Sequence, residues 1–103
     1  MRKSVEIQTE DKVRHLKYGM NALINLEQEM GRPLSEIGNE QNTKLEDLRT
    51  MFYVGLKHED KDLTQEQVGD IMDYLISVHG MNYLSEKLAE AMDFGNSAMP
   101  SEK

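Results

Sequence analysis

Apolar and polar residues alternate at the start of the chain and then recur at helical spacing along most of the rest. Residues 5–8 alternate between aliphatic and polar side chains, a polar turn follows, and Leu16 and Tyr18 then fall together on one face. A period of two is typical of a half-buried strand, so the pattern predicts a β-hairpin over residues 4–18 that Gly19 ends. Because a lone hairpin is only marginally stable in water, we expect this one to pack on other elements.

Two helices are predicted next. The first covers residues 20–30, where apolar side chains recur on one face. Gly31 suits a left-handed residue after the last turn, and Pro33 cannot continue a helix. The second begins at Thr43, because Thr43 and Glu46 fit the capping box, in which each side chain bonds the other residue's backbone N–H.

The second helix is unusual because its MFYVGL run, residues 51–56, is apolar almost all round. Such a helix is either central in the fold or covered by a partner, and the central position is the favoured interpretation. Gly55 in its interior costs about 1 kcal/mol relative to alanine. A close approach of another backbone or side chain would explain why this position lacks a side chain.

Two further helices are predicted in the C-terminal half. Thr64 and Gln67 form a second capping-box pattern just before an apolar stripe, and Gly80 is placed as a left-handed cap at the far end of that helix. The fourth helix is predicted over residues 81–94, with Asn82 as a plausible cap at its start.

Together these elements predict an α+β, mostly helical fold, in which an N-terminal β-hairpin packs on about four short helices. A chain of 103 residues suits one domain with one modest core, and we assign that domain to residues 1–94. The small and polar side chains of residues 95–103 predict a disordered tail.

Charge and composition argue against several classes of protein. The chain has 12 basic and 19 acidic residues, for a net charge of -7, which argues against binding to nucleic acid or to an anionic membrane. It has no cysteine, which excludes thiolate chemistry and fits a reducing cytoplasm. No apolar run approaches the ~20 residues of a membrane span, and the first residues lack the pattern of a signal peptide.

The segment GLKHEDKDLTQEQVGDIMD, residues 55–73, raises the question of a metal-binding loop. A calcium loop starting at Asp60 would need glycine and glutamate where this chain has Gln65 and Ile71. A zinc site lacks a second histidine at helical spacing. We therefore interpret the segment as a capped connection between helices. A less favoured rival is a metal-sensing site formed by His58, Glu59, Asp60 and Asp62.

Motifs for catalysis and for cofactor binding are missing from the sequence. No serine lies in a nucleophile-elbow pattern, no glycine-rich phosphate loop occurs, and the three histidines are scattered. A lone histidine near a helix end is more often a cap than a general base. We therefore predict no catalytic residue, no cofactor and no metal, and a protein that is not an enzyme.

Three stretches of the chain follow one another in a recognisable order. They are LKYGMNALINLEQEMGRPLSEIG, KLEDLRTMFYVGLKHED and LTQEQVGDIMD, which span residues 16–73 within a layout that extends over residues 5–93. In this order and spacing they resemble the tail assembly chaperones of long-tailed phages, prophages and gene transfer agents. The chain departs from that family at Tyr53-Val54, where members have Trp-Ala.

The resemblance implies a protein without enzymatic activity that acts in the cytoplasm of an infected host. Such chaperones bind the long, apolar, helical tape measure protein and keep it soluble until tail tube subunits polymerise around it and displace them. They are not expected in the finished virion. In many relatives a ribosomal frameshift makes a longer second product, and this chain would match the shorter one.

A chaperone for an exposed helical stripe needs an adaptable apolar groove and a charged exterior. Methionine is an adaptable side chain, and eight in 103 residues is a high number, although core packing is favoured for most of them. From their positions off the main stripes, we hypothesise that the partner-binding groove is formed by Met51, Tyr53, Val54, Met92 and Phe94. The same patch could contact tail tube protein or a second copy of the chain.

An alternative of a different class is a small phage or bacterial adaptor that binds and regulates a host or phage enzyme. Such an adaptor should form a defined one-to-one complex with that enzyme. It should also leave the solubility of a tape measure protein unchanged.

Overall fold

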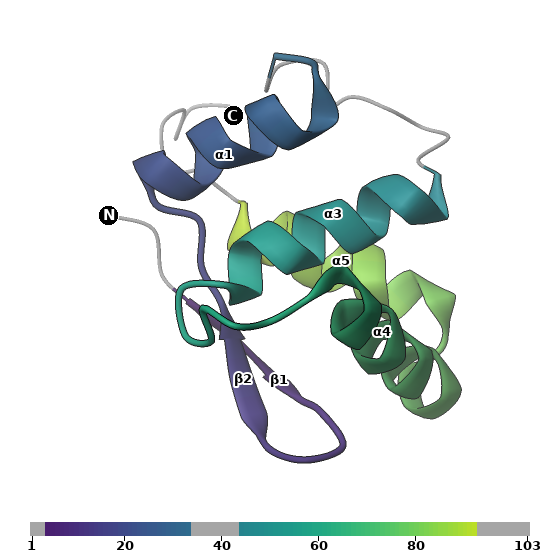
Figure 1. The fold of residues 1–103 in the computed structure, drawn as a ribbon. Coiled ribbons are helices and arrows are strands. Elements are labelled where there is room, and N and C mark those ends of the chain that lie inside the picture. The colour runs from purple at the N-terminus through teal and green to yellow at the C-terminus, as the bar shows by residue number, and fades with distance from the viewer. Residues whose placement is uncertain (1–3, 34–43, 93–103) are drawn as a thin grey trace, which may run out of the picture.

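The computed structural model describes residues 4–33 and 44–92, and within these ranges a β-hairpin precedes four helices (Figure 1). The α+β, mostly helical fold class is therefore confirmed. The predicted tail at residues 95–103 lies outside the described residues. The elements in chain order are β1 (Val5–Gln8), β2 (Val13–Leu16), α1 (Met20–Met30), α3 (Leu45–Leu56), α4 (Gln65–His79) and α5 (Met81–Ala91).

The two strands pair antiparallel, with Val5 opposite Leu16, and alternate residues of both strands are buried. Arg14 lies on the buried side as well, which the hydrophobic pattern did not predict. Its guanidinium faces two carboxylates, because Nη2 is 3.5 Å from Oδ2 of Asp11 and Nη1 is 3.6 Å from Oδ2 of Asp60. A buried charge is tolerated when it is paired in this way.

Helix α3 lies at the centre of the fold. It packs against α1, α4, α5 and β2, and Figure 1 shows it between α1 on one side and α4 with α5 on the other. A helix with neighbours all round is expected to be apolar all round. The interpretation of this helix as the central one is therefore confirmed, and its buried residues are Leu48, Met51, Phe52, Val54, Gly55 and Leu56.

The chain leaving the hairpin meets α3 at Gly55. A Cβ atom on Gly55 would lie 2.6 Å from both Cζ and the hydroxyl oxygen of Tyr18, and 2.9 Å from Cδ2 of Leu16. The backbone N–H of Lys17 donates to the Gly55 carbonyl at 3.0 Å. The close approach expected at Gly55 is therefore confirmed. The Tyr18 side chain makes the closest approach.

Tyr18 is completely buried, and burial raises the pKa of its hydroxyl far above its ordinary value. A buried neutral hydroxyl still needs a hydrogen-bond partner, because leaving it unpaired costs free energy. The Tyr18 hydroxyl donates to the backbone carbonyl of Met51 in α3. Packing and hydrogen bonding thus act together where the hairpin joins the central helix.

Two predicted helix boundaries are confirmed in detail. Gly31 follows α1 in the left-handed conformation, with φ 70° and ψ 24°, and its N–H donates to the Glu27 carbonyl at 2.8 Å. At the start of α4, the Thr64 hydroxyl accepts from the Gln67 N–H at 3.2 Å, and Oε1 of Gln67 accepts from the Thr64 N–H at 2.9 Å. The capping box of Thr64 and Gln67 is therefore complete.

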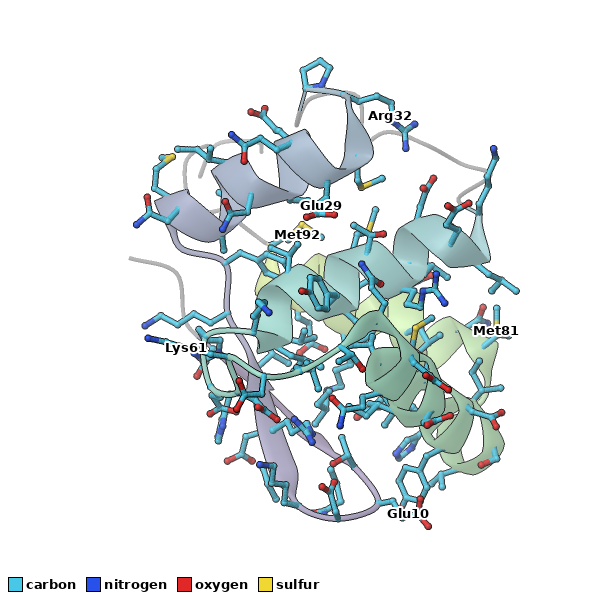
Figure 2. All side chains as sticks on the ribbon, viewed as in Figure 1. Glu10, Glu29, Arg32, Lys61, Met81 and Met92 are labelled. Atoms are coloured by element: carbon cyan, nitrogen blue, oxygen red, sulfur yellow. The ribbon has the colours of Figure 1, made fainter. Side chains whose placement is uncertain are left out.

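The start of α3 differs from the prediction. Its N-cap is Lys44, with no side-chain cap hydrogen bond, so the helix begins one residue later than the pair of Thr43 and Glu46 predicted. Thr43 itself lies outside the described residues. Glu46 and Asp47 instead place negative charge in the first turn, at the positive end of the helix dipole. Asp47 also pairs at 3.1 Å with Arg32, which lies just beyond the end of α1 (Figure 2).

The junction between α4 and α5 is also tighter than predicted. Gly80 has φ 93° and ψ 165°, a conformation open essentially to glycine alone and outside the left-handed helical region that the sequence suggested. Gly80 is both the C-cap of α4 and the N-cap of α5, so Asn82 lies inside α5 and does not cap it. Helix α5 ends at Ala91 with Met92 as C-cap, short of the predicted residue 94.

Replacing Gly55 with alanine should destabilise the fold, although alanine is the better helix former. The new Cβ would overlap the buried Tyr18 ring. Overpacking of this kind costs about 1–3 kcal/mol, which matches or exceeds the ~1 kcal/mol gained in helix propensity. Urea unfolding followed by circular dichroism measures the change in the free energy of unfolding.

Gly69→Ala in α4 is the matched control for Gly55→Ala. A Cβ on Gly69 would have one neighbour within 4 Å among the described atoms considered, Cδ of Arg49 at 3.9 Å. This substitution should leave stability unchanged or raise it by up to about 1 kcal/mol. Equal effects of the two substitutions would show that Tyr18 does not set the requirement for glycine at position 55.

Candidate functional site

The residues predicted to bind a partner do not form one exposed surface. Met51 and Val54 are only 5% and 8% exposed and belong to the core. Tyr53 and Met92 are partly buried and pack against that core, with Met92 at the end of α5 (Figure 2). Phe94 lies outside the described residues. A partner would reach Met51 or Val54 only by displacing a neighbouring element, and a binding role for this set stays a prediction.

A groove of about 580 Å³ lies between the first half of α3 and the middle of α4. Leu45 from α3 and Met72 and Ile76 from α4 give it an apolar lining, and Gly69 leaves part of the α4 backbone without a side chain. The groove is open to solvent rather than enclosed. Small-molecule sites usually bury most of the ligand surface, so an open groove of this kind suits the side of another chain.

The rim of the groove is mostly acidic. Glu46, Asp70 and Asp73 are exposed along it, and among the described residues of the lining Arg49 alone is basic. Nε of Arg49 is buried and has no hydrogen-bond partner among residues 4–33 and 44–92. The groove therefore combines apolar surface, negative charge and one unsatisfied donor.

Sequence reasoning did not locate this groove, although Gly69 was one signal for it. The helical pattern groups Leu45 with the buried stripe of α3, yet Leu45 is 60% exposed. Gly69, Met72 and Ile76 recur at i, i+3 and i+7, which places them on one face of α4. A glycine inside that face is the feature that could have revealed a surface where another chain approaches closely.

The acidic connection between α3 and α4 contacts strand β2. Oε1 of Glu59 accepts from the backbone N–H of His15 at 3.0 Å, and Oε2 of Glu59 lies 2.6 Å from Nδ1 of the same histidine. His58 joins the same point, because its Nε2 lies 2.8 Å from the His15 carbonyl. Glu59 and His58, two of the four residues of the rival metal-sensing site, therefore contact the hairpin instead.

Of the other two residues of that rival site, Asp60 is engaged through its carboxylate and Asp62 through its backbone N–H. Asp60 pairs with the buried Arg14, and its Oδ1 accepts from the Asp62 N–H at 3.3 Å. In the part of the chain that the structure describes, no group of three or more His, Asp or Glu residues is placed to hold a metal ion. These contacts favour the interpretation of the segment as a capped connection that also holds the hairpin.

The environment of Glu59 shifts its acidity. Burial raises the pKa of the Glu59 carboxyl, but the hydrogen bonds from the backbone and ring of His15 and the positive charge of His15 and His58 together lower it by more. The net pKa therefore falls below the ordinary value of 4.5. A carboxyl with a lowered pKa stabilises the folded state when it is ionised.

Glu59→Gln should lower the free energy of unfolding at neutral pH, and this loss should shrink in acid. The ionised carboxylate contributes its stability above the ordinary pKa of 4.5, and the contribution disappears as the pH falls through the lower pKa of the folded state. Urea unfolding of both proteins from neutral pH down into the acid range measures the difference.

Glu86→Gln, an exposed change of the same kind on α5, corrects for the altered net charge. A difference between wild type and Glu59→Gln that stayed constant through the acid range would contradict the role given to the Glu59 carboxylate.

Comparisons with known proteins were made for the whole chain. No protein-family model, curated protein or solved structure matched it. Within the described ranges, no helix has the length and apolar character needed to cross a membrane. Evidence about function therefore comes from the motifs in the sequence and from the geometry of the groove.

Proposed function

We propose that this protein is a phage tail assembly chaperone, which binds the tape measure protein, keeps it soluble and helps the tail tube to polymerise around it. In this proposal the chain acts in the host cell cytoplasm and is absent from the mature virion. It has no catalytic site, and its activity consists of covering an apolar helical surface and later releasing it.

The proposal rests on which residues line the groove. Two of the three stretches that resemble the chaperone family cover residues 44–60 and 63–73. Among the described residues, the same two stretches supply all of the groove lining except Ile76. The motifs that suggest a chaperone and the surface suited to bind a helix thus fall on the same two helices.

The physical properties of the groove fit this task. An amphipathic helix binds by placing its apolar face into an apolar groove, and Leu45, Met72 and Ile76 provide such a surface. The net charge of -7 on the chain would keep a complex soluble while the apolar stripe of the partner is covered.

Co-expression with the tape measure protein of the same genome tests the proposal. The tape measure protein should move from the insoluble to the soluble fraction and should be recovered in a pull-down with this chain. Adding tail tube protein should then release the chain, because polymerisation around the tape measure displaces its chaperones.

The same assay is repeated with the longer frameshifted product, where the genome encodes one. If the tape measure protein stays insoluble and unbound with both products, the chaperone function is wrong. A one-to-one complex with an enzyme, formed while the tape measure protein stays insoluble, would instead support an adaptor.

A further inference from the structure

Gly69 is the residue in the groove that the fold itself does not explain. A glycine inside a helix costs about 1 kcal/mol relative to alanine. At Gly55 that cost has a structural cause, because the Tyr18 ring occupies the space of a side chain. At Gly69 a Cβ would be in ordinary van der Waals contact with Arg49 at 3.9 Å, and no other atom of residues 4–33 and 44–92 among those considered lies within 4 Å of it. The folded chain could therefore accommodate alanine at position 69.

A glycine that intramolecular packing does not require suits the close approach of something from outside. Glycine permits another backbone to come near a helix, since the distance between packed helices depends on the side chains at the contact. Gly69 lies within the groove lining, with Met72 one turn further along α4 on the same face. A helix lying in the groove would thus cross α4 most closely at Gly69.

The charge of the rim indicates which helix would fit. Glu46, Asp70 and Asp73 are exposed around the apolar lining, and none of them forms an ion pair with another residue of the described ranges. Basic side chains beside the apolar stripe of a partner would meet these carboxylates. A second copy of this chain is a poor occupant, because each copy has a net charge of -7.

We propose that the groove between α3 and α4 holds one amphipathic helix of the partner, which crosses α4 at Gly69 and carries Lys or Arg beside its apolar stripe. The identity of the partner as the tape measure protein rests on the proposed function. The class of helix rests only on the lining, the rim and Gly69.

Two synthetic peptides of about 20 residues, long enough to form a helix, provide the test. Both carry the same stripe of leucine and alanine at helical spacing, and they differ only in the flanking residues, which are lysine in one and glutamate in the other. Fluorescence anisotropy measures the binding of each peptide to the full chain. The lysine peptide should bind, and the glutamate peptide should bind at least about tenfold more weakly.

Variants of the chain locate the binding site. Gly69→Leu fills the crossing point, and Asp73→Lys reverses a charge on the rim, so each should weaken binding of the lysine peptide by about tenfold or more. Glu86→Lys is the matched control, because it makes the same change of charge at an exposed position of α5 outside the groove. It should change binding by no more than about twofold.

Circular dichroism checks that each variant is folded, and Gly69→Ala replaces Gly69→Leu if the larger side chain disturbs the helix. The inference is overturned if the lysine peptide does not bind, or if the two groove variants bind it as well as Glu86→Lys does.

The tape measure protein, assayed with the same variants, separates this inference from the proposed function. Binding of the lysine peptide in the groove without binding of the tape measure protein would contradict the chaperone function alone. Binding of the tape measure protein that Gly69→Leu and Asp73→Lys leave intact would contradict the groove alone.

Discussion

The packing of Tyr18 against Gly55 is the contact on which the rest of the fold depends. The ring is buried against a helix that has no side chain at that position, and its hydroxyl donates to the Met51 carbonyl of the same helix. The N–H of Lys17 adds a bond to the Gly55 carbonyl. A two-stranded hairpin is only marginally stable alone, and these contacts attach it to the central helix, around which the other helices pack.

Gly55 and Gly69, each inside a helix, show how the same residue type can serve two different purposes. Gly55 faces inward, and side-chain atoms of Tyr18 and Leu16 take up the space that a Cβ atom would need. Gly69 lies in an open groove, and nothing in the described chain takes the space that its missing side chain leaves. The first glycine is explained by folding, whereas the second is explained by an approach from outside. The contrast is the physical basis for assigning the groove to a partner.

Much of the fold could be predicted from local patterns, because local chemistry determines those parts. Alternation predicted the hairpin, Gly31 predicted the end of α1, and the Thr64 and Gln67 pair predicted the start of α4. Features that depend on the assembled chain could not be predicted in the same way. One of the two carboxylates that pair with the buried Arg14 belongs to Asp60, which is distant in sequence. Gly80 by itself forms the junction of α4 and α5, where the sequence pattern predicted a separate cap for each helix.

The candidate site was harder to predict for a related reason. Met51 and Val54 lie off the main stripe of α3, which suggested an exposed face, but α3 has neighbours all round and those residues are in the core. Leu45 lies on the predicted stripe and is nevertheless exposed, because it sits in the first turn, at the edge of the groove. Which face of a helix stays open depends on how many neighbours it acquires, and a single helical pattern does not contain that information.

Mapping the bound surface by NMR tests the groove most directly, using amide chemical shifts of the chain with and without tape measure protein. If the partner binds in the groove, the largest changes should fall on the first turns of α3 and on residues 69–76 of α4. Changes centred on the hairpin or on α5, with the groove unaffected, would contradict binding in the groove.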